Sequence, residues 1–326
     1  MDFIVKTLKK FGMYEFVREK YNKRKRKKSL KNNIKGNYTF ENRGSNKKKM
    51  CMILAGYKMF SAEIVFKRIK KFVPKDVDVC ILSSGKYSNE LSKIAEDYNW
   101  SYLSTKRNNV SLIQNIAINL FKSAEYIYKL DEDIFVTKNF FNTLYNTYNQ
   151  LEKTADYKVG FVAPTIPINC IGNLNILKKY NLVDYYTKKF EKPMYALGAD
   201  RMNESDKNAV EFFWGEGGYL PNIDQMDYDF HLDKFNYMVC PIRFSIGAIL
   251  FKRSIWDEMN MFPVSKTGSD MGKDELDLCT YCMVNSYGMM ISLNTVVGHM
   301  AFGSQNRNME NYFHKHNDVF EIHKTN

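Results

Sequence analysis

The chain has 326 residues, of which 44% are hydrophobic and 15% aromatic, so it can bury a large core and is not a disordered protein. Its net charge of +12 is unevenly placed: residues 1–49 carry 17 Lys and Arg against 4 Asp and Glu, a net +13, which leaves −1 for the other 277 residues. The body is therefore close to neutral, which argues against nucleic-acid binding as its main function.

Cysteines and apolar runs bear on the compartment. The six cysteines are scattered through apolar segments, which is typical of buried free thiols in a reducing compartment. Cys279 and Cys282 form a C-x-x-C with no second pair at zinc-ribbon spacing, so packing is the better interpretation. No apolar run approaches the roughly 18 residues of a membrane span, and lysines interrupt the N-terminus where a signal peptide would be apolar. We expect a cytoplasmic protein.

Residues 1–49 are predicted to be a basic arm. Apolar residues recur at helical spacing near its start, and Lys23–Lys28 is a polybasic run. An amphipathic start before such a run is typical of attachment to an anionic membrane surface, which residues 1–35 would contact. The same run also fits a nuclear-localisation or nucleic-acid patch, or a solvated and partly disordered arm.

From Met50 the sequence alternates strands with helices, which predicts a parallel sheet with helical crossovers. The expected strands are 50–55, 77–82, 100–103 and 125–130, and the expected helices are 61–72, 89–98 and 110–123. No G-x-G-x-x-G follows the first strand, and no G-x-x-x-x-G-K-[ST] occurs. The sequence therefore lacks the motif that would identify a dinucleotide-dependent enzyme and the one that would identify a P-loop protein.

The second half, residues 161–305, is less regular before it returns to order, and residues 306–326 form a tail. Residues 160–235 are rich in aromatics, Asn and Gly and predict functional loops. Further elements are expected as a strand at 243–251, helices at 254–259 and 273–287, and a strand at 289–293.

The most informative motif is Asp131-Glu132-Asp133 at the end of strand 125–130. Strand side chains alternate, so Asp131 and Asp133 project to one side and Glu132 to the other. Two carboxylates at the carboxyl end of a strand suit a hard divalent cation. An isolated D-x-D is more often an acidic turn, so the motif needs support from the rest of the chain.

Three further segments give that support, and their order and spacing are more specific than any one of them. They are Asn108–Asn115 followed by Lys129–Asp133, then Phe244–Arg253 with Trp256 and Phe262, and then Gly272–Leu278. Through them the chain from Met50 to about Gln305 resembles the GT-A-type nucleotide-sugar glycosyltransferases, most of all the large inverting family 2 group. The resemblance implies an α/β fold with a mostly parallel, Rossmann-like central sheet flanked by helices. It also implies that residues 50–160 bind the nucleotide sugar and residues 161–305 the acceptor.

The resemblance assigns a catalytic base. The family's Glu-Asp pair is reversed here as Asp274-Glu275, and alignment through Asp277-Leu278 puts Glu275 at the position of the base, with Asp274 as second choice. A lone acidic pair at a helix start is more often a cap.

It also implies a metal centre. Asp133 would hold the cation, with Asp131 acting through water. His299 would be a co-ligand, and its nitrogen would favour Mn²⁺ over Mg²⁺. The alternative for His299 is a structural histidine near the surface.

Contacts to the donor and acceptor are expected from several strand ends and loops. Where the family usually has Arg-Asn, this chain has Gln114-Asn115. Candidates for the donor contacts are Ala55, Gly56, Tyr57, Ser84, Arg107, Asn115, Asp131 and Glu132. Candidates for the sugar or acceptor pocket are Trp214, Glu216 and Tyr219, for which packing is an equally good interpretation.

The sequence as a whole predicts a metal-dependent, inverting glycosyltransferase with a nucleoside-diphosphate sugar, UDP being favoured, as donor. A glycan or lipid-linked acceptor, as in surface polysaccharide synthesis, would explain a basic arm that holds the protein at the inner face of a membrane. The alternatives are a nucleotidyltransferase of similar α/β plan and a nucleic-acid-binding protein that works through its arm.

Overall fold

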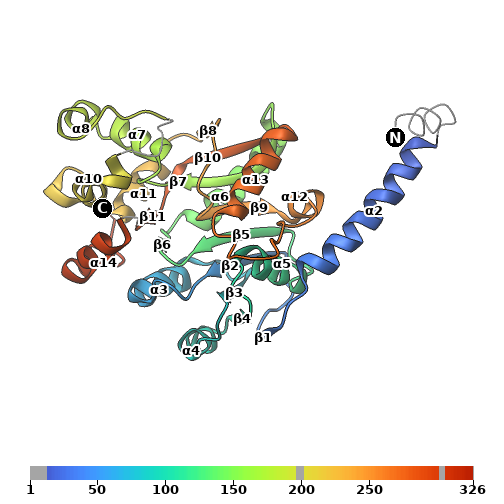
Figure 1. The fold of residues 1–326 in the computed structure, drawn as a ribbon. Helices are drawn as coiled ribbons and strands as arrows, with labels where there is room; N and C mark the ends of the chain where they lie inside the picture. The colour runs from blue at the N-terminus through green and yellow to red at the C-terminus, as the bar shows by residue number, and fades with distance from the viewer. Residues whose placement is uncertain (1–12, 196–201, 301–304, 326) are drawn as a thin grey trace.

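Within the described residues, nine strands form one central sheet that helices flank (Figure 1). The computed structural model describes residues 13–195, 202–300 and 305–325. The strand order is β1-β4-β3-β2-β5-β9-β7-β10-β8, with β1, β8 and β9 antiparallel to the other strands. The predicted α/β fold with a mostly parallel sheet is confirmed. The strands are β1 (Tyr38–Glu41), β2 (Lys49–Leu54), β3 (Val77–Ser84), β4 (Ser101–Thr105), β5 (Tyr126–Asp131), β7 (Lys158–Thr165), β8 (Tyr237–Val239), β9 (Ala248–Lys252) and β10 (Tyr287–Val296).

The first half follows the predicted alternation of strands and helices. Side chains cap two of its helices: Ser88 Oγ accepts from Leu91 N at 3.3 Å, and Asn109 Oδ1 accepts from Leu112 N at 2.8 Å. Because β2 pairs in parallel with both β3 and β5, the carboxyl ends of these strands meet at one edge of the sheet. The connecting helices are α3 (Ala62–Phe72), α4 (Asn89–Tyr98) and α5 (Val110–Leu120).

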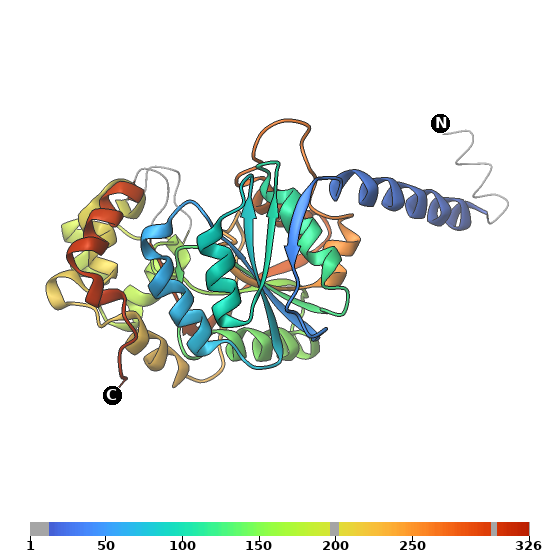
Figure 2. The ribbon, with the colours of Figure 1, turned by 90° about the horizontal axis from the view of Figure 1, so that it is seen from below.

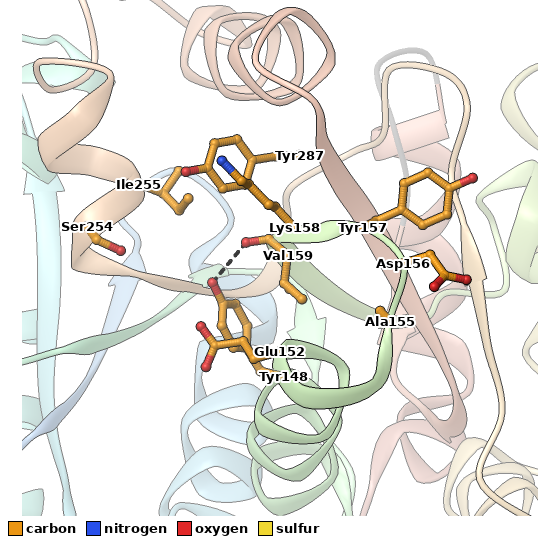
Figure 3. A pocket seen from close by; sticks show the side chains of 10 residues that line it. All are labelled: Tyr148, Glu152, Ala155, Asp156, Tyr157, Lys158, Val159, Ser254, Ile255 and Tyr287. Atoms are coloured by element: carbon orange, nitrogen blue, oxygen red, sulfur yellow. Dashed lines mark hydrogen bonds between the residues drawn. The ribbon is translucent and has the colours of Figure 1, made fainter.

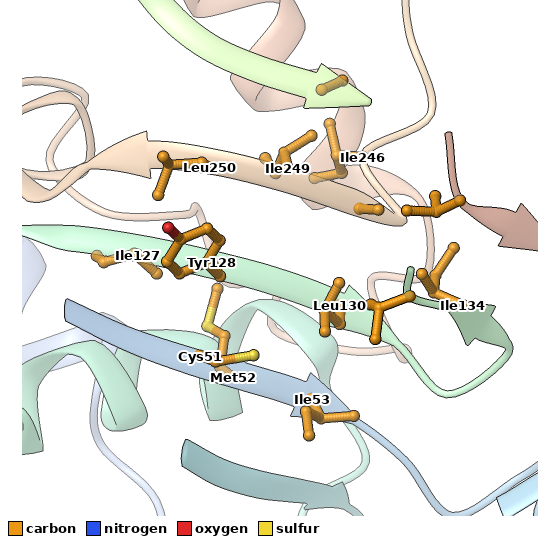
Figure 4. Packing of buried hydrophobic residues seen from close by; sticks show 14 of the residues in the cluster. Cys51, Met52, Ile53, Ile127, Tyr128, Leu130, Ile134, Ile246, Ile249 and Leu250 are labelled. Carbon is orange, nitrogen blue, oxygen red and sulfur yellow. The ribbon is translucent and has the colours of Figure 1, made fainter. Parts of the chain in front are cut away.

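The central residues of the middle strands are buried, and their packing holds in place the strand that leads into the acidic triplet. Figure 4 shows side chains of β2, β5 and β9 packed together, among them Ile53, Tyr128, Leu130 and Leu250. Each of these four is at most 1% exposed. Close packing of this kind resists displacement, so β5 gives its last residue, Asp131, a rigid base.

Later helices cover the second half of the sheet, and one of them contains the C-x-x-C. Cys279 and Cys282 are buried free thiols, and burial raises the pKa of each to about 12. Both thiols stay uncharged in an apolar cluster, in line with the packing interpretation. These helices are α6 (Phe140–Thr154), α12 (Arg253–Glu258) and α13 (Lys273–Val284).

Residues 170–231 contain short helices with a hydrophobic cluster of their own. The prediction of irregular loops is wrong here, because the aromatics pack against one another: Tyr186, Phe212, Phe213 and Phe230 are all at most 3% exposed. The elements are α7 (Cys170–Lys179), α8 (Val183–Lys189), α9 (Met202–Ser205), α10 (Lys207–Phe213) and α11 (Ile223–His231).

At the N-terminal end, a long helix leads into the edge of the sheet. Figures 1 and 2 both show α2 (Tyr14–Asn33) extending away from the body. β1 follows it and pairs antiparallel with β4, so the sheet also takes in residues before Met50, where the folded part was expected to start. Most of the apolar residues expected on the arm's amphipathic face lie outside the described residues. Among the helices described, none is long and apolar enough to span a bilayer.

The C-terminal segment is fastened to the body by a buried arginine of α3. Arg68 donates to the carbonyls of Val136 at 2.8 Å, Phe320 at 3.2 Å and Glu321 at 2.9 Å, and it forms an ion pair with Asp224 of α11. Its side chain is fully buried. One guanidinium group therefore joins the segment just after the acidic triplet to the end of the chain, which follows α14 (Asn306–Lys315).

Candidate active site

The acidic triplet begins at the last residue of β5, and a short ladder brings a histidine beside it. β6 (Ile134–Phe135) directly follows the triplet and pairs antiparallel with β11 (Gly298–His299). In this register His299 lies opposite Ile134, and Met300 N donates to the carbonyl of Asp133 at 3.2 Å. The structure thus brings together Asp133 and His299, which lie far apart in the sequence.

Asp133 is buried between Lys58 and His299. Its Oδ2 lies 2.6 Å from Lys58 Nζ and 3.4 Å from His299 Nε2. Burial alone would raise the pKa of Asp133, but the charges and hydrogen bonds of His299 and Lys58 outweigh it and hold that pKa well below its usual range. Asp133 is therefore an anion in the folded protein.

Asp131 belongs to a second network, centred on a buried lysine. Lys129 Nζ donates to Asp131 Oδ1 at 2.8 Å and to the Ile246 carbonyl at 3.0 Å, and it lies 3.9 Å from Asp274 Oδ2. Burial alone would lower the pKa of Lys129, but the charges of Asp131 and Asp274 raise it. The lysine therefore stays charged and links the acidic triplet to the start of α13.

Glu132 lies in the turn after β5, where strand alternation no longer applies, and its carboxylate anchors the end of β2. Its carboxylate accepts from Gly56 N at 2.6 Å and from Tyr57 N at 2.9 Å. Tyr57 OH in turn donates to the Ser84 carbonyl at 2.8 Å, while Ala55 continues from β2. Five of the predicted donor contacts, Ala55, Gly56, Tyr57, Ser84 and Glu132, thus lie together at the carboxyl ends of these strands, although the Glu132 oxygens accept from backbone amides.

The two acidic residues at the start of α13 have different partners. Asp274 is buried and accepts from Gln114 Nε2 at 2.8 Å. Glu275 accepts from Arg243 Nε at 2.6 Å and from Ile246 N at 3.3 Å. Burial raises the pKa of Glu275, and the charge of Arg243 offsets only part of that rise.

Two predicted donor residues have other contacts. Asn115 is fully buried and uses its whole amide: Nδ2 donates to the carbonyls of Asn33 and Phe262, while Oδ1 accepts from Trp256 Nε1 and Phe262 N. It holds the region around α12 in place, which corrects the expectation of a donor contact. Arg107 is half-buried and donates to the carbonyl of Ser265, in the loop before α13.

The predicted acceptor-pocket residues are not drawn together around the triplet. Trp214 is buried and packs on Phe135 and Phe320, at ring distances of 5.3 Å and 4.4 Å. It also needs Gly298, because a Cβ there would lie 2.3 Å from the indole. Its role is packing beneath β11, which corrects the pocket assignment.

The other two pocket candidates lie in and next to the 3-10 turn η2 (Glu216–Gly218). Glu216 is exposed and accepts from Tyr312 OH at 3.3 Å. Tyr219 is 46% exposed, and its ring lies 4.2 Å from that of Tyr185. Both keep a surface that a ligand could reach.

A cavity elsewhere in the protein is separate from these carboxylates. It has a volume of about 620 Å³ and opens at the amino ends of β7 and β10 (Figure 3). β7 and β5 run in the same direction, since both are antiparallel to β9. The cavity at the amino end of β7 and the triplet at the carboxyl end of β5 therefore lie at opposite ends of the strands. Its lining residues are Tyr148, Glu152, Ala155, Asp156, Tyr157, Lys158, Val159, Ser254, Ile255 and Tyr287.

The donor atoms around Asp133 fit a divalent cation with two protein ligands. Within the described residues, no three His, Cys, Asp or Glu side chains gather as a ligand group. Asp133 and His299 nevertheless offer a carboxylate oxygen and an imidazole nitrogen 3.4 Å apart. One carboxylate oxygen and one imidazole nitrogen fit a divalent metal ion only if other groups complete its coordination.

Comparison with known proteins gives distant structural likenesses. No protein-family model matches the chain, and no curated protein matches it. A mannosyltransferase from Pyrobaculum calidifontis, in complex with GDP-Man and Mn²⁺, has a TM-score of 0.45 at 13% identity, over 91% of this chain and 71% of that one. S. aureus TarS in complex with UDP-GlcNAc has a TM-score of 0.47 at 10% identity, over 79% and 60%. GalNAc-T7 with UDP, GalNAc and Mn²⁺ has a TM-score of 0.44 at 12% identity, over 78% of this chain and 44% of that one. The chain therefore spans less than two thirds of the length of TarS and of GalNAc-T7.

Proposed function

We propose that the protein is a metal-dependent glycosyltransferase that moves a sugar from a nucleoside diphosphate to a hydroxyl of a glycan or lipid-linked acceptor. The observation that carries the proposal is the arrangement of two carboxylate pairs at one edge of the sheet. Asp131 ends β5 and Asp133 follows in the next turn, Asp274 and Glu275 lie in the first turn of α13, and Lys129 lies between the pairs. Glycosyl transfer needs a group that stabilises the dianionic diphosphate on one side of the sugar and a proton acceptor on the other side. The two carboxylate pairs can supply both.

On the donor side, Asp133 and His299 would hold the divalent cation. When bound, that cation neutralises the charge that develops on the departing diphosphate. Lys129 keeps Asp131 in a fixed orientation through its 2.8 Å hydrogen bond. Gly56, Tyr57 and Ser84, at the ends of β2 and β3, would contact the nucleoside, for which we favour uridine.

On the acceptor side, Glu275 would act as the base. The acceptor oxygen forms a bond to the anomeric carbon, the bond from that carbon to the diphosphate oxygen breaks, and the diphosphate leaves with the electron pair. The proton of the acceptor hydroxyl passes to the Glu275 carboxylate. Attack opposite the leaving group inverts the anomeric centre. Asp274 is the second choice, because its carboxylate is already held by Gln114.

Nucleotide release tests this function. Incubation with UDP- and GDP-sugars and Mn²⁺ should release UDP or GDP, and Asp133→Asn should lower that release about 100-fold or more, because an anchor for the developing charge is lost. Asp97→Asn, the same substitution at an exposed carboxylate of α4 that pairs with Lys93 at 2.8 Å, is the control and should keep wild-type release. A fully active Asp133→Asn variant would contradict the proposal. Pyrophosphate release from a nucleoside triphosphate would favour a nucleotidyltransferase.

The basic arm suggests where the acceptor is met. The described part of the arm, α2, carries the Lys23–Lys28 run and exposes apolar side chains of Phe16 and Tyr21, at 65% and 63%. Each basic residue near an anionic surface contributes about 1 kcal/mol to binding. We infer peripheral attachment to the inner face of a membrane, which would place the site near lipid-linked or surface-glycan acceptors.

A further inference from the structure

Lys58 was not among the residues expected from the sequence, yet it contacts the most deeply buried carboxylate of the triplet. Its side chain is 25% exposed and that of Asp133 is 3% exposed, and Nζ lies 2.6 Å from Oδ2. The chain just before Lys58 is held in place, because Glu132 accepts from Gly56 N and Tyr57 N. The triplet therefore fixes the position of Lys58 with one carboxylate and binds its ammonium with the next.

The oxygen that Lys58 contacts is the one a divalent cation would need. His299 Nε2 lies 3.4 Å from the same Oδ2, so this is the Asp133 oxygen that the structure offers to an ion shared by the two residues. An ammonium group and a divalent ion on one carboxylate oxygen repel each other. Binding of the ion would therefore require the ammonium of Lys58 to move.

We propose that Lys58 is an exchangeable counter-cation: it neutralises Asp133 in the protein without metal, and a divalent ion displaces its ammonium toward the diphosphate of the donor. This inference rests on the function proposed above. A lysine suits the task, because its flexible stem lets the ammonium move while its three donors bind phosphate as a point charge. Metal and donor should then bind cooperatively, since the diphosphate gives the displaced ammonium a new partner.

Titration with Mn²⁺ alone and with UDP tests this, using electron paramagnetic resonance of free Mn²⁺ as a readout independent of turnover. Lys58→Met removes the competing cation, so we expect Mn²⁺ without UDP to bind about tenfold more tightly than to the wild type. The wild type should gain affinity for Mn²⁺ when UDP is added, and Lys58→Met should lose most of that gain.

Lys86→Met is the matched control, because Lys86 is exposed and lies over the ring of Tyr57, 5.0 Å from its centroid. This variant removes one positive charge next to Tyr57, the residue before Lys58. It should leave the affinity for Mn²⁺ within about twofold of wild type, since charges exposed to solvent are screened. Equal tightening in both variants would overturn the specific role of Lys58.

The remaining outcomes separate the inference from the function it rests on. If the wild type binds Mn²⁺ but Lys58→Met binds it equally or less tightly, the counter-cation role is overturned while the metal site stands. If the wild type binds no Mn²⁺ with or without UDP, the metal centre of the proposed function fails as well. Lys58→Arg keeps the charge and decides the matter if Lys58→Met does not fold: it should bind Mn²⁺ no more tightly than wild type, and tighter binding would overturn the inference.

Discussion

Glu275 and Asp274 are neighbours in sequence, but their side chains have different freedom. Asp274 lies in a closed network with Gln114 and Lys129, and its side chain is 5% exposed. Glu275 has one charged contact, Arg243, which is itself half exposed. A carboxylate that accepts a proton from an incoming hydroxyl must be reachable, so we propose Glu275 rather than Asp274 as the base.

The pKa of Glu275 gives a prediction for the pH dependence of turnover. Burial raises this pKa, Arg243 and Lys129 lower it, and Ile246 N supports the anion. The base works when ionised, so the rate should fall as the pH drops through a pKa above the usual glutamate value. Arg243→Gln removes a lowering charge, and the acidic limb of kcat against pH should move to higher pH.

Two further variants check that prediction. Glu275→Gln should abolish the limb together with most of the turnover, while nucleotide-sugar binding measured by calorimetry stays close to wild type. An unchanged limb in Arg243→Gln would show that another group takes the proton.

Sequence patterns identified the residues of this site unevenly. Strand alternation predicts that Asp131 and Asp133 share one side, but β5 ends at Asp131 and the next two residues form a turn, so the two carboxylates have different partners, Lys129 and Lys58. Lys58 and Arg243 could not be found this way, because each reaches a carboxylate on a distant segment through a long side chain. The only signal for Lys58 is its place just after a strand end, next to residues already chosen as donor contacts.

Among the elements, the connection from β1 to β2 depends on one carboxylate of β3. Asp78 is 4% exposed and accepts from Ser45 N and Ser45 Oγ at 3.0 Å each and from Lys47 N at 3.0 Å. Burial alone would raise the pKa of Asp78, but these hydrogen bonds and the charge of Lys47 lower it. The carboxylate therefore joins the edge strand to the middle of the sheet.

Asp78→Ala should lower the free energy of unfolding by about 1–3 kcal/mol, because the backbone donors of the connection lose a buried acceptor. A lowered pKa means that the stabilisation by Asp78 is present above its unfolded-state pKa and is lost as the pH falls through the folded-state pKa. The two proteins should therefore converge in stability in strongly acidic solution. Urea unfolding followed by circular dichroism at several pH values measures this.

The matched control is Asp76→Ala. The Asp76 side chain is 64% exposed and pairs with Lys49, so its removal should cost no more than about 1 kcal/mol. An equal loss in both variants would mean that the hydrogen bonds of Asp78 do not support the connection.

The sequence predicted elements well where each had a clear period and failed where the elements were short. Strands β2 to β5 and their helices were expected within a few residues, because each strand is an apolar run and each helix has one apolar face. Helices α8 and α10 have seven residues each, too few for a helical period to stand out among many aromatics. These helices are stabilised by aromatic side chains that pack against residues distant in the sequence, and such contacts cannot be read from a local pattern.

For the molecule as a whole, the projecting α2 allows the proposed membrane attachment to be tested separately from the chemistry. Deletion of residues 1–28 removes the polybasic run and leaves Asn33, whose carbonyl accepts from Asn115 at 3.1 Å. The shortened protein should lose binding to vesicles that contain phosphatidylserine and keep nucleotide release with a soluble acceptor analogue. Co-sedimentation with vesicles measures the first and the release assay the second.

Salt and lipid composition sharpen that test. Binding of the full chain should weaken as salt rises and be much weaker on neutral phosphatidylcholine vesicles, because the attraction is electrostatic. Undiminished co-sedimentation of the shortened protein would contradict the membrane role of the arm.

The arginine that fastens the C-terminal segment also sets an order of events during synthesis. Arg68 and its partner Phe320 are separated by 252 residues. At translation rates of roughly 5–20 residues per second, roughly 10–50 s pass between the two. During that time the guanidinium lacks two of its carbonyl acceptors, and the segment after the acidic triplet lacks its final support. The central sheet can therefore form first, and the contacts that Phe320 and Glu321 make with Arg68 join the C-terminal segment to it only after those residues have been made.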